Sequence, residues 1–310
     1  MQVAILGASS QISKGLIKLF VKNNDNHLFL FVRDEIVFKQ WIESQDPNNK
    51  NFEIHHIKDF NSNFNIDLII NCVGVGDPNK VMQMGSNILD ITKIYDDIVL
   101  DYLHENPRAK YIFLSSGAVY GDIFSAPADE DSKSLINLNF DTPANFYSLA
   151  KLYAEARHRA LPNLNIADVR VFNYISPSID LNGNFFIAQA IKASIDGKIF
   201  QTNSTNINRD FVGPEDLFSL ISAINNFPQL NDSFDCFSKK PIDKFKILDF
   251  LQSNFNLEFI VHNNEVSDFI KDSKENYYSV NYKAKAIGFE PEFESIENIN
   301  NSILAIIDKY

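Results

Sequence analysis

The sequence predicts an α/β fold in which a doubly wound parallel sheet carries a smaller C-terminal lobe. Apolar runs of strand length alternate with amphipathic helical patterns up to Phe172, as they do where helices connect parallel strands. The first run leads through a turn of small residues into a helix. With 310 residues, 45% of them hydrophobic, the chain can form one large domain or two intertwined ones.

The composition excludes several classes of protein. A formal net charge of −12 disfavours a nucleic-acid surface, which needs clustered positive charge. No apolar run reaches the ~18 residues of a membrane span, and no charged segment or cleavage site of a signal peptide precedes the first strand. Cys72 and Cys236 fall in apolar runs, and no metal-ligand spacing is present. We therefore expect a cytoplasmic protein with reduced thiols, no membrane contact and no metal.

A turn of small residues separates the first predicted strand, residues 3–6, from the first helix. This layout seats a pyrophosphate on a helix N-terminus in Rossmann-type folds, which carry three glycines at a spacing of three. Here Gly7 is present, but Ser10 and Ser13 occupy the other two positions. Serine still allows a phosphate group to approach the backbone fairly closely, and its hydroxyl can donate a hydrogen bond to that phosphate. This stretch alone is equally compatible with a nucleotide site and with an ordinary strand–helix turn.

The second predicted strand, residues 28–32, ends in Arg33 and Asp34. In such folds the residue that closes this strand faces the adenosine ribose, where an acid binds the 2′-hydroxyl and an arginine suits a 2′-phosphate. Arg33, with Ser9 as a neighbouring group, therefore favours NADP(H), although NAD(H) stays possible. The other interpretation of Arg33 is a solvated side chain at the end of a strand.

Two further strands are predicted over residues 52–57 and 66–70. Asp59 follows the first of them, where it could meet the amino group of an adenine. The second is a buried strand that runs through an Asn-Cys-Val stretch to Gly74, a residue that allows the backbone to approach a ligand closely. A single helix with many apolar positions is then expected over residues 81–103.

The fifth predicted strand, residues 111–114, delivers Ser115 and Ser116 at its carboxyl end, where ligands bind in a parallel sheet. A hydroxyl group at this place can polarise a carbonyl group while a second residue donates the proton. The sixth strand, residues 166–172, is closed by Asn173.

Tyr147 and Lys151 lie four residues apart in a stretch of helix-forming residues that begins after Pro143. This spacing puts both side chains on one face of the helix. A free tyrosine titrates near ~10, and an ammonium group a few ångströms away can lower that pKa toward neutrality, so the pair could transfer a proton. Taken alone, a packed tyrosine and a lysine that reaches solvent explain the pattern better.

In combination and order, these stretches resemble the extended short-chain dehydrogenase/reductases that act on nucleotide sugars. The resemblance spans most of the chain. The matching stretches are Gly7-Ala-Ser-Ser10, Leu114-Ser-Ser-Gly-Ala-Val-Tyr-Gly121, Tyr147-Ser-Leu-Ala-Lys151, Arg170-Val-Phe-Asn173, Asn208-Arg-Asp-Phe-Val212 with Glu215-Asp-Leu217, and Ser279-Val-Asn-Tyr-Lys-Ala-Lys-Ala-Ile-Gly-Phe-Glu-Pro291.

The resemblance implies a catalytic triad of Ser116, Tyr147 and Lys151. Tyr147 would be the acid and base, and Lys151 would bind the nicotinamide ribose and depress the pKa of Tyr147. Ser116 is chosen over Ser115 because it lies four residues before Tyr120. The residues expected at the dinucleotide are Gly7, Ser9, Ser10, Gln11, Ile12, Arg33, Asp59, Phe60, Cys72, Val73, Gly74, Asn87, Tyr147 and Lys151.

On the substrate side the resemblance implies contacts from Ser116, Asn173 and Arg209. Arg209 would hold the diphosphate of a sugar nucleotide, and its other interpretation is a surface salt bridge. Sugar dehydratases of this family carry an acidic residue or pair directly after the catalytic hydroxyl. Gly117 and Ala118 stand there in this chain, so elimination of water is not expected.

Two lobes with interleaved boundaries follow from these assignments. Residues 1–173 are expected to form the Rossmann domain, to which residues 205–237 return. Residues 174–204 and 238–310 are expected to form the substrate-binding lobe. The resemblance also implies a homodimer that pairs the helix bearing Tyr147 with the helix before the fifth strand. Ile91, Ile94 and Ile98 of the latter are compatible with such an interface, and equally with facing the sheet.

The expected function is hydride transfer between NADP(H) and a nucleotide-linked sugar, with reduction of a 4-keto sugar favoured by Arg33. A 4-epimerase with tightly held NAD(P) is the close alternative, because the same three residues serve both reactions. A dinucleotide-binding regulator without catalysis is the alternative of another class. The presence of hydroxyl, phenol and ammonium in the right order favours an enzyme.

Overall fold

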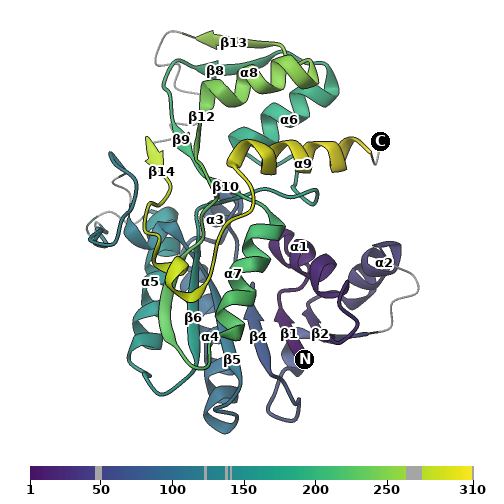
Figure 1. Ribbon diagram of the computed structural model, residues 1–310, viewed down its shortest axis with the longest axis vertical. Helices are drawn as coiled ribbons and strands as arrows, with labels where there is room; N and C mark the ends of the chain where they lie inside the picture. Colours follow the sequence, from purple (N-terminus) through teal and green to yellow (C-terminus); the bar gives the residue numbers. More distant parts are fainter. Residues whose placement is uncertain (46–50, 122–123, 137–138, 140–141, 263–273, 309–310) are drawn as a thin grey trace.

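The computed structural model describes residues 1–45, 51–121, 124–136, 139, 142–262 and 274–308 (Figure 1). Its main sheet has seven strands, all parallel, in the order β11-β6-β5-β4-β1-β2-β3. These strands are β1 (Gln2–Leu6), β2 (His27–Val32), β3 (Phe52–His56), β4 (Leu68–Asn71), β5 (Lys110–Ser116), β6 (Ile166–Val171) and β11 (Asn231–Asp235). The predicted doubly wound parallel sheet is confirmed. Its strand order reverses between β1 and β4, which is where ligands bind in such sheets.

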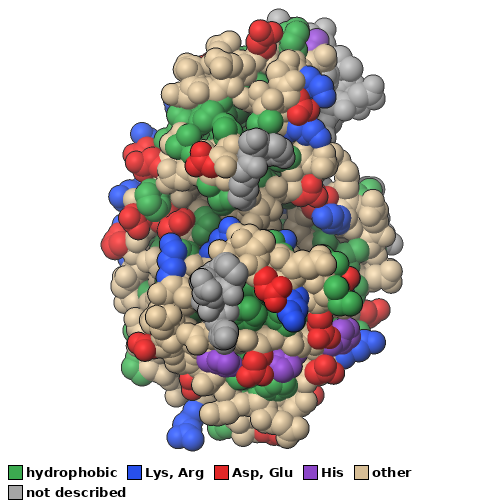
Figure 2. Space-filling view, turned by 90° about the vertical axis from the view of Figure 1, so that its right-hand side faces the viewer, with side chains coloured by type: hydrophobic (Ala, Val, Ile, Leu, Met, Phe, Trp, Pro, Cys, Tyr) green, Lys and Arg blue, Asp and Glu red, His purple; other side chains and the backbone are tan. Residues whose placement is uncertain are grey.

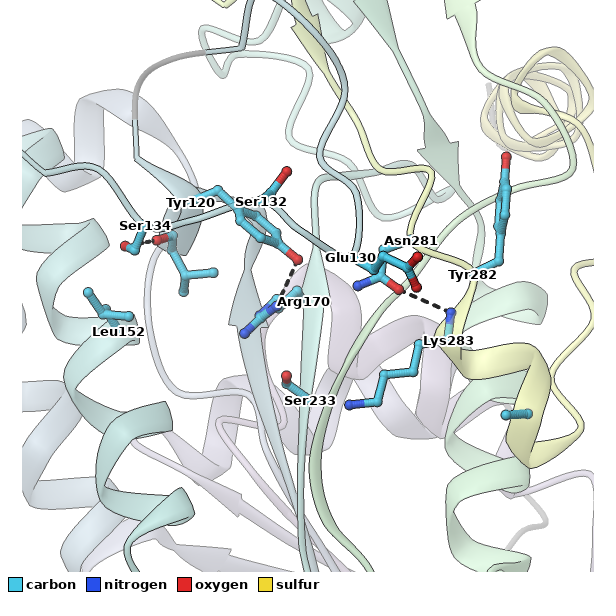
Figure 3. A pocket seen from close by; sticks show the side chains of 12 residues that line it. Tyr120, Glu130, Ser132, Ser134, Leu152, Arg170, Ser233, Asn281, Tyr282 and Lys283 are labelled. Atoms are coloured by element: carbon cyan, nitrogen blue, oxygen red, sulfur yellow. Dashed lines mark hydrogen bonds between the residues drawn. The ribbon is translucent and has the colours of Figure 1, made fainter.

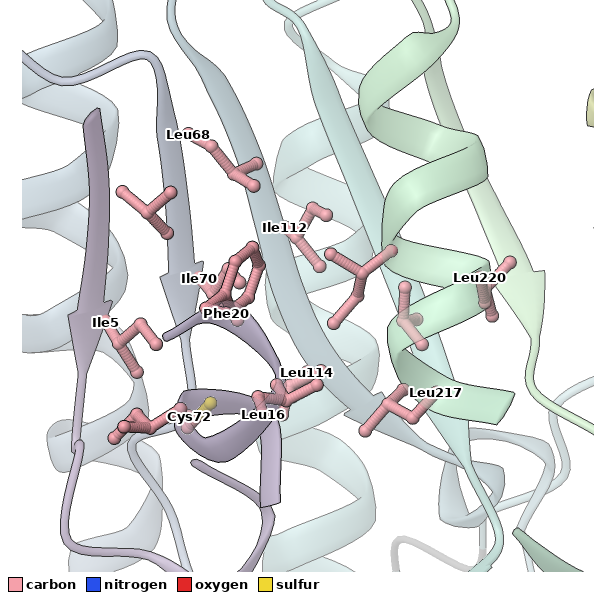
Figure 4. Close-up of a cluster of buried hydrophobic side chains, with 14 of the residues drawn as sticks. Ile5, Leu16, Phe20, Leu68, Ile70, Cys72, Ile112, Leu114, Leu217 and Leu220 are labelled. Carbon is pink, nitrogen blue, oxygen red and sulfur yellow. The ribbon is translucent and has the colours of Figure 1, made fainter. Parts of the chain in front are cut away.

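Helices cover both faces of the sheet, and neighbouring strand residues point into different cores. On one face, Ile5 and Ile70 pack against helices α1 (Gln11–Phe20), α2 (Glu35–Gln45) and α7 (Pro214–Asn226) (Figure 4). On the other face, Leu6 and Ile69 pack with α4 (Asn87–Glu105) and α5 (Pro143–Arg159). Burial on two sides explains why the strands read as continuous apolar runs.

The prediction of a single helix over residues 81–103 is wrong. The chain forms a short helix, α3 (Pro78–Met84), and then α4, with a break at Gly85. Gly85 has φ +53°, a left-handed value that a glycine adopts without steric penalty and that a continuing α-helix does not contain. Apolar periodicity runs through both helices and conceals this break.

The C-terminal lobe has a core of its own, formed by helices α6 (Phe186–Asp196), α8 (Lys244–Phe255) and α9 (Ser295–Ile307). Strands β8 (Phe200–Asn203) and β13 (Phe259–His262) pair beside them. Figure 1 shows this lobe beyond the end of the main sheet at which β6 leads into β7 (Asn173–Tyr174).

Short strands connect the lobe to the main sheet. Strand β10 (Phe211–Val212) pairs with β7, and β9 (Asn208–Arg209) pairs with β12 (Ile242–Asp243) and β14 (Asn276–Tyr277). The carboxyl ends of the main strands therefore face these short strands. Any ligand at those ends would lie between sheet and lobe.

Cys72 and Cys236 are free thiols, and both are buried, as expected. No helix among the residues that the structure describes is long and apolar enough to cross a membrane. On the face shown in Figure 2, acidic and basic side chains are interspersed, and the described residues form no continuous basic surface there.

Candidate active site

Ser116 is the last residue of β5 and caps the following 3-10 turn, η2 (Gly117–Tyr120). Its Oγ accepts a hydrogen bond from the amide of Ala118 at 3.2 Å and lies 3.4 Å from the phenol oxygen of Tyr277 in β14. Ser116 is only 6% exposed. The hydroxyl group thus sits at the junction between the main sheet and the C-terminal lobe.

Helix α5 brings Tyr147 and Lys151 to the same end of β5. Thr142 caps this helix by accepting a hydrogen bond from the amide of Asn145 at 3.2 Å, and Pro143 occupies its first turn. Lys151 is buried, and its ammonium group donates to the carbonyl of Leu114 at 2.8 Å. Burial lowers the pKa of Lys151 to about 8, so the side chain is mostly protonated at neutral pH.

The pKa of Tyr147 is raised, because burial of the phenol outweighs its interaction with the Ser116 hydroxyl, which lowers the pKa. The depression expected from Lys151 is not found. The Lys151 ammonium is held by the Leu114 carbonyl and lies 4.4 Å from the ring centroid of Phe113. Tyr147 is therefore a protonated phenol at neutral pH, close to the Ser116 hydroxyl.

The turn after β1 is built closely against the end of β4. Gly7 has φ +71°, and a Cβ there would lie 3.1 Å from the backbone of Cys72 and Val73. The Ser13 hydroxyl donates to the Gly7 carbonyl at 2.9 Å, and Ser10 accepts from the amide of Ser13 at 3.1 Å as the cap of α1. The two serines in glycine positions thus hold the turn internally.

This turn fits a pyrophosphate. Helix α1 has no acidic residue in its first turn, so its free amides and its dipole favour an anion. Ser9 is exposed, Gln11 donates to the Ser176 hydroxyl at 3.4 Å, and Ile12 packs against the core. Close packing occurs at Gly15, where a Cβ would lie 2.2 Å from the Tyr174 hydroxyl. That glycine stands two positions after Ser13 and was missed by the sequence analysis.

The end of β2 lies beside the same turn, because the amides of Gly7 and Ala8 both donate to the Phe31 carbonyl. Arg33 is exposed there. The Asp34 carboxylate accepts a hydrogen bond from the amide of Val37 at 3.0 Å, so it caps α2. Both residues are exposed, but the Asp34 carboxylate is already engaged as this cap.

Two other residues expected at the dinucleotide, Asp59 and Phe60, follow β3. Asp59 ends the 3-10 turn η1 (Ile57–Asp59), and Phe60 comes directly after it in the chain. Asp59 is exposed. Phe60 is buried, with its ring 5.1 Å from that of Phe31, so only its backbone could contact a cofactor.

At the end of β4, Cys72 is buried, and burial raises the pKa of its thiol to about 12. Val73 and Gly74 follow, and a Cβ on Gly74 would lie 3.6 Å from the Lys151 ammonium. Asn87, at the start of α4, is exposed. The buried amide beside this loop belongs to Asn71, which the sequence analysis did not select; it accepts from the amide of Val73 and donates to the phenol of Tyr111, both at 3.0 Å.

The expected substrate residues converge on Tyr277, another residue that the sequence analysis missed. Asn173 donates to the Tyr277 carbonyl at 3.2 Å, and the guanidinium of Arg209 lies 5.9 Å from the Tyr277 ring. Arg209 is 6% exposed and also donates to the Lys274 carbonyl at 2.8 Å, so it is not a surface side chain. The stretch that suggested the C-terminal signature began at Ser279, two residues too late to include this tyrosine.

Gly117 has no room for a side chain. A Cβ there would lie 2.3 Å from the ring of Phe172, and that ring packs against Tyr120, Phe124 and Tyr277. An acidic residue directly after Ser116 would therefore require this aromatic cluster to rearrange.

The arrangement can exchange a proton with an oxygen atom placed at the carboxyl end of β5. A protonated phenol and a hydroxyl group lie together there, next to a buried ammonium group and a turn suited to a dinucleotide. No group of His, Cys, Asp and Glu among the described residues could hold a metal ion.

Comparisons with known proteins agree with this layout. The model of the NAD dependent epimerase/dehydratase family matches residues 3–235. No curated protein sequence matches the chain.

Solved structures share its fold. UDP-glucuronic acid 4-epimerase from Bacillus cereus, in complex with UDP-glucuronic acid and NAD, is 15% identical with a TM-score of 0.81, covering 100% of both chains. UDP-glucose 4-epimerase from Thermotoga maritima, with UDP-glucose, is 14% identical with a TM-score of 0.80, covering 100% of this chain and 99% of that one. UDP-N-acetylglucosamine 4-epimerase from Methanobrevibacter ruminantium, in complex with UDP-N-acetylmuramic acid, is 16% identical with a TM-score of 0.79 and the same coverage.

Proposed function

The chain belongs to the NAD dependent epimerase/dehydratase family, and from this premise we propose that it is an NADP(H)-dependent enzyme that reduces a nucleotide-linked 4-keto sugar. The observation that carries the proposal is that the Tyr147 phenol lies by the Ser116 hydroxyl, next to the buried Lys151. Structural neighbours of the fold are enzymes whose complexes contain UDP-sugars.

Residues of this chain supply the proton chemistry. A nicotinamide dinucleotide, when bound, supplies or accepts a hydride. The raised pKa of Tyr147 keeps its phenol protonated at neutral pH, ready to protonate the oxygen of a carbonyl that is being reduced. The Ser116 hydroxyl can donate to the same oxygen and stabilise its developing charge. Lys151, mostly charged with a pKa of about 8, adds positive potential beneath both.

The dinucleotide would lie along the ends of β1, β2 and β4. Its pyrophosphate would meet the amides at the start of α1, and its nicotinamide ribose would meet Tyr147 and Lys151. The exposed Arg33 would bind a 2′-phosphate, since the Asp34 carboxylate already caps α2.

A 4-epimerase is the second candidate, favoured by the neighbours that are UDP-sugar 4-epimerases with NAD in their complexes. The same phenol and hydroxyl serve both reactions. Dehydration is disfavoured, because the Phe172 ring occupies the place that a side chain at position 117 would need.

The reaction is tested by incubating the purified protein with NADPH and a panel of nucleotide-linked 4-keto sugars. The reductase is expected to consume NADPH in a one-to-one ratio with product. Isomerisation of a nucleotide sugar by protein that co-purifies with unconsumed dinucleotide would contradict the reductase and favour the epimerase.

Arg33→Asp is expected to weaken NADPH binding at least about tenfold, since a hydrogen-bonded ion pair with the 2′-phosphate is lost. Binding of NADH should change little. Fluorescence titration of both dinucleotides measures the difference, and Arg108→Asp, at an exposed arginine before β5, controls for the change in net charge. Equal affinities of the wild type for NADPH and NADH would refute the preference.

We also propose that the protein is a homodimer that pairs helices α4 and α5. Ile98 packs against the core, but Ile94 on α4 and Tyr153 on α5 are 54% and 51% exposed. Ile94→Asp is expected to shift sedimentation at micromolar concentration from dimer to monomer, whereas Leu304→Asp, at an equally exposed position on α9, should not. A monomeric wild type would count against the dimer.

A further inference from the structure

Glu155 lies one turn after Lys151 on α5 and is buried beneath the end of β5. Its carboxylate accepts a hydrogen bond from the Ser115 hydroxyl at 2.5 Å. It also accepts hydrogen bonds from two nitrogens of Arg170 in β6: Nε contacts both carboxylate oxygens, at 3.0 and 3.1 Å, and Nη2 contacts one at 2.5 Å. Ser115 precedes Ser116 in the chain. This ion pair therefore fixes the backbone that carries the proposed catalytic hydroxyl.

A second chain of hydrogen bonds leads from Arg170 to the segment that carries Tyr277, the lobe residue beside Ser116. Arg170 Nη1 donates to the Tyr120 phenol at 2.8 Å, and Tyr120 donates to Asp235 at 2.9 Å. The Ser279 hydroxyl donates to the same carboxylate at 2.6 Å. Ser279 stands two residues after Tyr277.

Both chains of hydrogen bonds end beside the Ser116 hydroxyl. One ends at Ser115, the neighbour of Ser116, and the other holds the segment whose Tyr277 phenol lies 3.4 Å from the Ser116 hydroxyl. Arg170 is the shared member, and it pairs with Glu155 and with Asp235. Both carboxylates are buried, so removal of the arginine would leave them without their common cation.

On the basis of the proposed function, we propose that Glu155 and Arg170 are positioning residues of this active site. They set the place of the Ser116 hydroxyl by anchoring its chain neighbour Ser115 and its lobe partner Tyr277 to a single ion pair. They touch neither substrate nor cofactor.

A cavity of about 390 Å³ opens onto Arg170 of this ion pair (Figure 3). Tyr120, Arg170, Ser134, Ser233 and Asn281 form part of its wall. Small solutes can therefore reach the Arg170 guanidinium from the surface, which makes this residue suitable for chemical rescue.

Arg170→Ala is expected to lower kcat about 10²-fold with little change in KM, the size of effect that a displacement of about 1 Å can have on a reacting group. Guanidinium chloride at millimolar, non-denaturing concentration should enter the cavity and recover much of the lost kcat. Arg159→Ala removes an arginine that pairs with Asp168, also in β6, and should change neither kcat nor its response to guanidinium. An Arg170→Ala enzyme with wild-type kcat, or with a loss that guanidinium leaves untouched, would overturn the proposal.

A double-mutant cycle tests whether the pair acts through Ser116. Glu155→Gln keeps the shape of the side chain and removes its charge, so it should lower kcat in the wild-type background. In a Ser116→Ala background the same change should have almost no further effect, since the group being positioned is absent. Losses that multiply would overturn the proposal and indicate general destabilisation.

A third measurement does not depend on turnover. With tyrosine labelled at Cζ with carbon-13, the NMR signals of Tyr147 and Tyr277 report the hydrogen bonds of their phenols. Glu155→Gln should shift both signals, and Arg159→Ala should shift neither. If the wild type reduces no nucleotide sugar, the proposed function fails while these signals still decide the positioning; unshifted signals in folded Glu155→Gln would refute it.

Discussion

Tyr147→Phe is expected to lower kcat about 10²–10⁴-fold, the contribution of a well-placed general acid or base. The phenylalanine ring fills the same partly buried position on α5, so the helix and its caps should persist. What is lost is the hydroxyl that lies close to Ser116 and is protonated at neutral pH. Dinucleotide affinity should stay close to that of the wild type, because the turn after β1 is unchanged.

Tyr153→Phe is the matched control, since it removes a phenol from the same helix at a 51% exposed position. Steady-state turnover and equilibrium binding of the dinucleotide should be measured for both variants. If Tyr147→Phe kept full turnover, the assigned acid would be wrong. If it replaced the wild type in cells while turnover was lost, the chain would be a dinucleotide-binding regulator.

The sheet could be predicted because its signal is local. The central strands are buried on both faces, as with Ile69 and Ile70 in β4, and so appear as unbroken apolar runs. Turn residues then separate the runs. The position of Ser116 at the end of β5 and the shared face of Tyr147 and Lys151 follow from the same local periods.

Features that depend on distant contacts could not be predicted in this way. Tyr277 lies beside Ser116 although 161 positions separate them in the chain. Asn71 matters because Tyr111, from another strand, meets its amide. The raised pKa of Tyr147 depends on how deeply the phenol is buried and on where the Lys151 ammonium points. Neither the burial of the phenol nor the direction of the ammonium group can be derived from residue spacing along a helix.

The altered glycine fingerprint lies between these cases. Ser10 and Ser13 weaken the motif on paper, yet their hydroxyl groups bind the turn that glycines would otherwise leave open. The close approach between helix α1 and neighbouring side chains occurs at Gly15, against Tyr174 and Pro214. Gly15 lies outside the expected spacing of three glycines, so a motif defined by that spacing alone does not include it.

The second large effect concerns stability and centres on His158, at the end of α5. Its imidazole is fully buried and hydrogen-bonded through both nitrogens, to Asp168 at 2.6 Å and to Asp96 at 2.8 Å. Burial alone would lower its pKa, but the hydrogen bonds to Asp168 and Asp96 outweigh burial and raise the pKa to about 9. The ring is therefore a buried cation between two buried carboxylates.

His158→Gln is expected to lower the free energy of unfolding by about 3–5 kcal/mol, because it leaves Asp96 and Asp168 in the core without the cation that joins them. The lost contacts connect α4, α5 and β6, so the whole domain should unfold at lower urea. His104→Gln is the matched control, at an exposed position on α4.

The pH dependence separates charge from packing. The pKa of His158 is raised from an ordinary 6.5 to about 9, so its stabilisation is complete below pH 6.5 and is lost as the pH rises to 9. A shift of this size corresponds to roughly 3 kcal/mol. Urea unfolding at several pH values should show this fall in the wild type and in His104→Gln, but not in His158→Gln. Wild-type stability as flat as that of His158→Gln would mean that the imidazole is neutral in the core, and that packing alone accounts for its effect.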